Sequence, residues 1–243
     1  MTALLEIDGL TKRFGGVTAV DDCSFAVPER SITALVGPNG SGKTTAFNLI
    51  TGYARADAGT VRYGGANVRR PDPVRLSRSG LTRTFQQARI FPDLTLVENM
   101  VAAVQQPWRA TFARRVRRSE RERAVRLLEE FGIARLAGER AGNLSYGQKK
   151  LLEFAAVLMG EPRLVLLDEP TAGVNPILVG QIEERIRELN ARGLTFLVVE
   201  HNMNLVMRLC DPVVVLAQGT KLSEGRPDDV RNDPRVLDAY LGG

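Results

Sequence analysis

The sequence has few of the residues that build metal clusters or disulfide frameworks. Its 243 residues include one His and two Cys. Cys23 and Cys210 lie far apart, without CxxC spacing, in apolar stretches. A zinc cluster and a disulfide scaffold both need more such residues at regular spacing. We therefore expect both cysteines to be buried, reduced thiols.

Long apolar runs are also missing. The longest candidates, residues 164–167 and 195–199, have the length of strands, whereas a membrane span needs about 18 apolar residues. Glu6 and Asp8 interrupt the N-terminal stretch where a secretory signal would be apolar. The sequence thus predicts a chain without a membrane span or export signal, located in the cytoplasm.

Lysine is scarce, and the positive charge comes from arginine. Lys and Arg exceed Asp and Glu by 33 − 28 = 5, with five Lys against 28 Arg. Eight of the Arg fall in residues 109–126, opposed there only by Glu120 and Glu122. Such a cluster raises the possibility of a nucleic-acid or anionic-membrane partner. Its arginines cannot share one helical face, which disfavours a helix that binds in a nucleic-acid groove. Two alternatives remain: a solvated surface, or a surface that docks on a partner or faces lipid.

What is present is an ordinary globular composition, 44% hydrophobic and 25% charged. The first thirty residues read as antiparallel strands, and residues 93–161 show helical spacing without strand signals. Elsewhere strands alternate with helices, which is typical of a parallel α/β sheet. The predicted strands are 31–36, 163–167, 195–199 and 213–217, and the predicted helices are 44–51, 177–192 and 203–210.

The segment GPNGSGKTT fits the pattern GxxxxGK[ST], placed between a predicted strand and a predicted helix. Glycines let successive backbone N–H groups point into one concavity that cradles phosphates at a helix N-terminus. Lys43 would reach the β- and γ-phosphates, and the Thr44 hydroxyl suits Mg²⁺. A simple Gly-rich turn would not explain the strand–loop–helix context. The candidate nucleotide-binding residues are Gly37, Asn39, Gly40, Ser41, Gly42, Lys43, Thr44 and Thr45.

Two adjacent carboxylates, Asp168 and Glu169, follow the apolar strand RLVLL. Parallel sheets bind ligands beyond the carboxyl ends of their strands. Asp168 is therefore a candidate Mg²⁺ ligand and Glu169 a candidate general base for water. On its own the motif could equally be a strand that exits into a turn.

A second phosphate cradle is predicted at LSYGQ, before a helix expected over residues 149–159. Ser145 is a plausible N-cap, and Gly147, next to Gln148, permits close backbone approach. A chain with two cradles but one phosphate-loop lysine makes sense if the second cradle serves the nucleotide of another copy.

In this order, the phosphate loop, LSYGQ and the Asp-Glu strand make the chain resemble an ATP-binding cassette (ABC) ATPase over nearly its whole length. The resemblance implies a P-loop NTPase (RecA-like) core with an N-terminal antiparallel β subdomain, both within 1–86 and 161–243, and an inserted helical subdomain, 87–160. It further implies ATP and Mg²⁺ as cofactors and a second ATPase subunit, identical or paralogous. It also implies integral membrane permease subunits as partners, which would place the chain at the cytoplasmic face of the membrane. A solute-binding protein would be an indirect partner through the permease.

The same resemblance assigns roles to three more residues. Phe14 would stack on adenine, the alternative being a strand-core aromatic. Gln86 would contact Mg²⁺ and the attacking water. His201 would bind the γ-phosphate and Glu169, the alternative being a structural strand-end histidine. One departure is Asn175, where many cassettes carry Asp; it keeps hydrogen bonding but drops a charge.

Four segments, AGVNP, RTFQ, EHNM and the terminal AYLGG, most resemble ATP-binding subunits of bacterial branched-chain amino-acid importers. Transport of urea, amides or lipopolysaccharide is the nearest alternative. A nucleic-acid-associated ABC ATPase is disfavoured, because the chain lacks a sustained heptad run and a second phosphate loop. A kinase or GTPase would not explain LSYGQ and His201.

Overall fold

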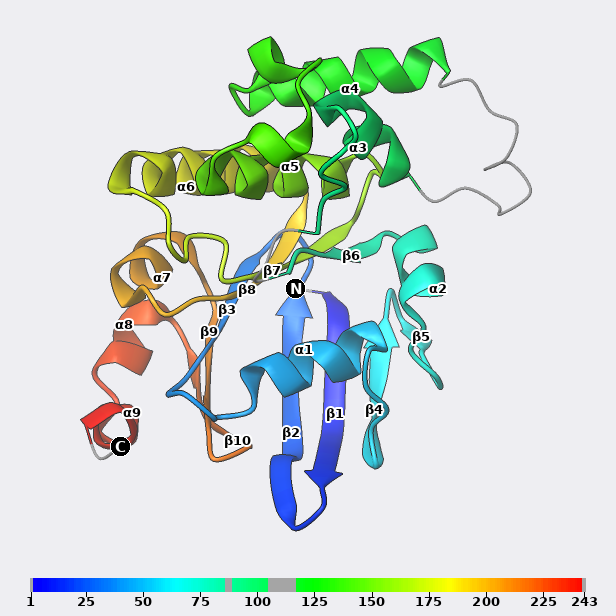
Figure 1. The fold of residues 1–243 in the computed structure, drawn as a ribbon. Helices are drawn as coiled ribbons and strands as arrows, with labels where there is room; N and C mark the ends of the chain where they lie inside the picture. Colours follow the sequence, from blue (N-terminus) through cyan, green and yellow to red (C-terminus); the bar gives the residue numbers. More distant parts are fainter. Residues whose placement is uncertain (1, 86–88, 105–116, 242–243) are drawn as a thin grey trace.

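The protein consists of two β-sheets, helices that lie beside them, and a further group of helices at one end (Figure 1). This computed structural model describes residues 2–85, 89–104 and 117–241. Gln86 and the arginines at 109, 114 and 115, which the sequence singled out, lie outside the described residues.

The strands are β1 (Ala3–Phe14), β2 (Val17–Pro28), β3 (Ile32–Val36), β4 (Ala58–Tyr63), β5 (Ala66–Asn67), β6 (Leu81–Arg83), β7 (Leu164–Asp168), β8 (Thr195–Val199), β9 (Val213–Ala217) and β10 (Thr220–Gly225). The α-helices are α1 (Lys43–Thr51), α2 (Pro73–Arg78), α3 (Leu96–Ala102), α4 (Arg118–Glu130), α5 (Tyr146–Leu158), α6 (Pro176–Ala191), α7 (Met203–Leu209), α8 (Pro227–Arg231) and α9 (Pro234–Leu241). Short 3₁₀ turns are η2 (Ala134–Leu136) and η3 (Ala141–Asn143).

The N-terminal sheet is antiparallel, with strand order β2-β1-β4-β5. Register pairs such as Ile7 with Phe25 and Ile7 with Val61 tie β1 to both neighbours. These inward residues are buried, whereas Asp8 on the same strand is exposed, the alternation expected of a sheet with one solvated face. The antiparallel start predicted from the sequence is confirmed.

The second sheet carries the α/β core. Its strand order is β10-β9-β3-β8-β7-β6, in which β10 alone pairs antiparallel, with β9. Every residue of β3, β7 and β8 is buried, as expected for parallel strands covered on both faces. The predicted P-loop NTPase core with an additional antiparallel sheet is confirmed.

Helices α3, α4 and α5 pack together at the end of the molecule away from the antiparallel sheet (Figure 1). Leu96, Met100, Leu128 and Leu152 are fully buried between them. The helical spacing predicted for this region is therefore confirmed over the described residues, while the boundaries 87 and 160 stay a prediction.

The predicted start of the helix after LSYGQ is wrong by three residues, since α5 begins at Tyr146 and not at Lys149. Ser145 and Gln148 form a capping box, in which Ser145 Oγ accepts from the Gln148 backbone N–H and Gln148 Oε1 accepts from the Ser145 N–H. This reciprocal pair satisfies the first free amides and allows the helix to start immediately.

The described part of the arginine cluster lies on α4 and its N-cap. Ala124 and Leu128 are buried, whereas Arg118, Arg121 and Arg126 are exposed. Except for Arg123, which donates to the Leu158 carbonyl at 3.0 Å, the described arginines of the cluster thus lie on the outer face of a helix whose inner face is packed. Within the described part of the chain, no helix is both long enough and apolar enough to cross a membrane.

Both cysteines are buried free thiols, as predicted. Burial raises the pKa of Cys23 to about 11 and that of Cys210 to about 12, from 9.0. A folded chain therefore keeps both protons at pH values where the unfolded chain releases them, and high pH favours unfolding.

We predict that the free energy of unfolding falls between pH 9 and about 11, as the unfolded thiols ionise. The slope is at most about 1.4 kcal/mol per pH unit for each thiol. Urea unfolding in reducing buffer at several pH values measures this, and the Cys23→Ala/Cys210→Ala variant is the control for other titrating groups. An equal slope in that variant contradicts the prediction.

Candidate nucleotide-binding and hydrolysis site

The loop from β3 to α1 has a backbone that only glycine tolerates at two positions. Gly37 has φ +151° and Gly42 φ +100°. A Cβ at Gly37 would lie 2.0 Å from the Leu216 carbonyl oxygen, and one at Gly42 would lie 2.4 Å from that of Ala19. The loop therefore packs against the backbone of neighbouring strands while it leads into the N-terminus of α1, which suits anion binding.

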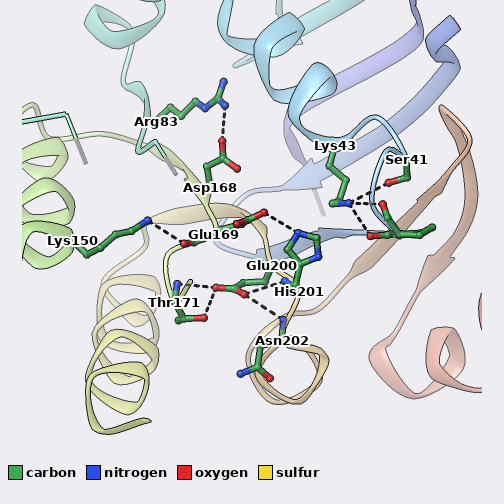
Figure 2. Close-up of polar contacts among 12 residues, drawn as sticks. Ser41, Lys43, Arg83, Lys150, Asp168, Glu169, Thr171, Glu200, His201 and Asn202 are labelled. Atoms are coloured by element: carbon green, nitrogen blue, oxygen red, sulfur yellow. Dashed lines mark hydrogen bonds and ion pairs between the residues drawn. The ribbon is translucent and has the colours of Figure 1, made fainter. Parts of the chain in front are cut away.

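Lys43 is the first residue of α1 and its ammonium lies within the loop (Figure 2). Its Nζ donates to the carbonyl oxygens of Gly37 and Pro38, both at 2.8 Å, and to Ser41 Oγ at 3.3 Å. Burial lowers the pKa of Lys43, and the negative charge of Glu169 opposes that shift. The phosphate-loop lysine and the predicted base are thus close enough to interact electrostatically.

Glu169 and His201 meet at the carboxyl edge of the parallel sheet. His201 Nε2 lies 2.8 Å from Glu169 Oε1 (Figure 2). The two residues follow the adjacent strands β7 and β8, and the Glu169 N–H donates to the Val199 carbonyl at 2.9 Å. Glu169 has φ 49°, a left-handed conformation that is uncommon outside glycine and often found at functional sites.

Asp168, the last residue of β7, forms a buried ion pair with Arg83 of β6. Arg83 Nη2 lies 2.6 Å from Asp168 Oδ2, with both side chains at most 7% exposed. The same guanidinium donates to Asn48 Oδ1 of α1 at 2.7 Å. Arg83 therefore links the candidate metal ligand to the helix that carries the phosphate loop.

The LSYGQ residues lie away from this edge. Among the described residues, Ser145, Gly147 and Gln148 line a groove of about 800 Å³ together with Asn175 and others, a groove that contains no residue of the phosphate loop. Within the chain Gly147 packs against α6, because a Cβ there would lie 2.5 Å from Leu178 Cδ2; the close approach of a phosphate to Gly147 stays a prediction. The structure therefore does not bring Ser145, Gly147 and Gln148 together with Lys43 within one chain.

Helix α5 connects LSYGQ to the hydrolysis site. Lys150 Nζ donates to the Glu169 carbonyl at 3.2 Å. One turn on, Glu153 Oε1 accepts from the backbone N–H groups of Phe85 at 3.0 Å and Arg89 at 3.3 Å. Burial raises the pKa of Glu153, and these two hydrogen bonds oppose the shift. Glu153 thus holds both sides of the segment that contains Gln86.

Phe14 ends β1 and is 54% exposed, with Lys12 Nζ 5.2 Å from its ring centroid. The alternative of a strand-core aromatic is therefore wrong, and the ring is free to stack on a planar ligand. Asn175 caps α6, its Oδ1 accepting from the Leu178 N–H at 2.9 Å. A neutral side chain at this position is thus sufficient for the local fold.

The sequence analysis missed two polar residues at the site, Arg83 and Glu200. Arg83 stands in the RTFQ segment, where the sequence assigned a role to Gln86 but none to Arg83. Glu200 is 4% exposed and accepts four hydrogen bonds at the end of β8. An acid directly before His201, after an otherwise apolar strand, was the available signal.

A phosphate cradle, a buried lysine and a carboxylate–imidazole pair at one sheet edge define a P-loop ATPase. A family model described as "ABC transporter" matches residues 20–172, and one described as "Branched-chain amino acid ATP-binding cassette transporter" matches residues 220–243.

Relatives match over almost the full chain. The high-affinity branched-chain amino acid transport ATP-binding protein BraF of Pseudomonas aeruginosa is 39% identical, and LivG of Escherichia coli is 37% identical, each with 98% of both chains covered. A crystal structure of a nucleotide-free ATP-binding cassette from an ABC transporter has a TM-score of 0.89 at 33% identity and covers 100% of both chains. The ADP conformation of an ATP-binding cassette gives the same values.

The chain therefore belongs to the ABC transporter family, among the ATP-binding proteins related to LivG and BraF. It is a nucleotide-binding ATPase.

We predict that Arg83→Ala lowers the free energy of unfolding by about 3–5 kcal/mol, because it leaves the buried Asp168 carboxylate without its counter-charge. Urea unfolding measures the loss. Adding Asp168→Asn to Arg83→Ala should recover part of it, since the uncompensated charge is then removed. A loss below about 1 kcal/mol in the single variant is incompatible with a buried, mutually dependent pair.

Proposed function

We propose that this ATPase powers the import of branched-chain amino acids through integral membrane permease subunits. Two findings support the solute class: the relatives named for that transport and the match of the C-terminal residues 220–243 to the corresponding family model. Transport of urea, amides or lipopolysaccharide is the alternative. The chain would act at the cytoplasmic face of the membrane, receive solute indirectly from a solute-binding protein and need no nucleic acid.

The phosphate loop would hold the triphosphate of ATP. Backbone N–H groups of residues 37–45 would surround the β-phosphate, and the Lys43 ammonium would exchange its carbonyl partners for phosphate oxygens. Thr44 and Asp168 offer the oxygen donors that Mg²⁺ prefers, and Gln86 would be a further contact. When bound, Mg²⁺ neutralises charge on the β- and γ-phosphates.

Hydrolysis would be an in-line attack of water on the γ-phosphate. The Glu169 carboxylate would orient the water and accept its proton. His201 would hold Glu169 through the 2.8 Å contact and donate a hydrogen bond to the γ-phosphate. This contact between His201 and Glu169, beside the phosphate loop, is the observation that carries the assignment.

The distance of LSYGQ from the phosphate loop favours a head-to-tail dimer with ATP between subunits. Ser145, Gly147 and Gln148 of one subunit would contact the γ-phosphate on the other, with the α5 N-terminus facing it. Phe14 would stack on the adenine. The second subunit would be an identical chain or a paralogue, and the division into 1–86 with 161–243, and 87–160, would separate nucleotide binding from the part that docks on the permease.

We predict that Glu169→Gln binds ATP with unchanged affinity but lowers kcat by at least about 100-fold, the range expected for loss of a general base. The variant should accumulate as an ATP-bound dimer in size-exclusion chromatography, because hydrolysis no longer reopens it. Lys43→Ala is the matched control, expected to lose ATP binding and remain monomeric. Wild-type turnover in Glu169→Gln would show that Glu169 is not the base.

We predict that proteoliposomes containing this chain and the permease subunits that co-purify with it take up leucine when ATP is enclosed and binding protein is added outside. Urea and acetamide serve as competing solutes, and vesicles with Glu169→Gln report ATP-independent leakage. Uptake of urea or acetamide in preference to leucine would replace the proposed solute and leave the ATPase assignment intact.

A further inference from the structure

We propose that Glu200 is a positioning residue for hydrolysis: it fixes the backbone of His201 and ties it to the turn after β7, so that the imidazole stays on Glu169. The inference rests on the roles proposed for His201 and Glu169. It concerns a side chain that would not itself touch ATP.

Each oxygen of the Glu200 carboxylate holds a different segment (Figure 2). Oε1 accepts from the Thr171 backbone N–H at 2.9 Å and from the Thr171 hydroxyl at 2.6 Å. Oε2 accepts from the backbone N–H groups of His201 at 3.1 Å and Asn202 at 3.4 Å. One carboxylate thus joins the residues that follow β8 to those that follow β7.

These bonds close a ring of contacts around the proposed catalytic pair. Thr171 is two residues after Glu169, and His201 is one residue after Glu200. The backbone bond from Glu169 to Val199 forms one side of the ring, and the side-chain contact between His201 and Glu169 forms another. His201 is exposed, with 46% of its side chain accessible. The orientation of the His201 side chain therefore depends on the His201 backbone, which is held by its hydrogen bond to Glu200.

Only a carboxylate can satisfy this arrangement. All four groups facing Glu200 are donors, two at each oxygen, and Glu200 and Thr171 are buried at 4% and 7% exposure. A glutamine has one acceptor oxygen and one NH₂ donor group. Either the two donors of Thr171 or the backbone N–H groups of His201 and Asn202 would therefore face that NH₂ group. The positive charge of Lys150 is near enough to interact with the Glu200 carboxylate.

If Glu200 had only a structural role, its replacement would lower the melting temperature in proportion to the lost hydrogen bonds and leave kcat unchanged. A positioning role makes a different claim, namely that the effect of Glu200 on kcat passes through His201. The two can be separated by measuring kcat at saturating ATP, the Kd for ATP and the melting temperature on the same variants.

We expect Glu200→Gln to lower kcat about tenfold or more, with the Kd for ATP within about twofold of wild type. Glu29→Gln is the matched control: Glu29 also forms a charged contact, with Arg163 at 2.9 Å, but at the opposite edge of the sheet, and its kcat should not change. Thr171→Ser, which keeps both donors, should retain kcat, and Thr171→Val, which loses one, should fall between Thr171→Ser and Glu200→Gln.

The decisive comparison is made in the His201→Ala background. If Glu200 acts through His201, adding Glu200→Gln lowers kcat by less than about twofold further; a full additional tenfold loss overturns the inference. If Glu200→Gln does not fold, the same cycle is run with Thr171→Val. Activity lost in His201→Ala but retained in Glu200→Gln and Thr171→Val refutes only the role of Glu200. Activity retained in His201→Ala refutes the proposed catalytic role of His201 and, with it, this inference.

Discussion

The burial of the parallel strands on both faces determines where this protein can place polar chemistry. Every position of β3, β7 and β8 is buried, so charged groups are placed at the strand ends or beyond them. Because the strands run parallel, their carboxyl ends lie at one edge, where the phosphate loop follows β3, Asp168 ends β7 with Glu169 after it, and Glu200 and His201 follow β8. The site is thus a consequence of the sheet, with helices supplying its outer contacts.

The sequence predicted those parts that depend on a few neighbouring residues. A glycine pattern before a lysine, an apolar strand that ends in two acids and a serine at a helix start each form their structure locally, and the structure has all three where expected. The start of α5 was misplaced by three residues because LSYGQ was read as a loop, whereas the Ser145–Gln148 capping box puts most of it in the first helical turn.

The contacts that the sequence did not predict join segments far apart in the chain. Arg83 and Asp168 are separated by 85 residues, and Thr171 and Glu200 by 29. No local pattern encodes such pairs, because they arise only when β6, β7 and β8 lie side by side. The exposure of Phe14 was equally undetermined, since a strand-end aromatic can face either the core or solvent.

Helix α5 has a mechanical consequence. Its N-cap is Ser145, Lys150 holds the Glu169 carbonyl, and Glu153 holds the backbone at Phe85 and Arg89. A helix resists compression along its axis and keeps about 1.5 Å per residue, so these attachments have fixed spacing. A shift of the LSYGQ end along the helix axis would therefore act on the contacts to the Glu169 carbonyl and to the Phe85 and Arg89 backbone together.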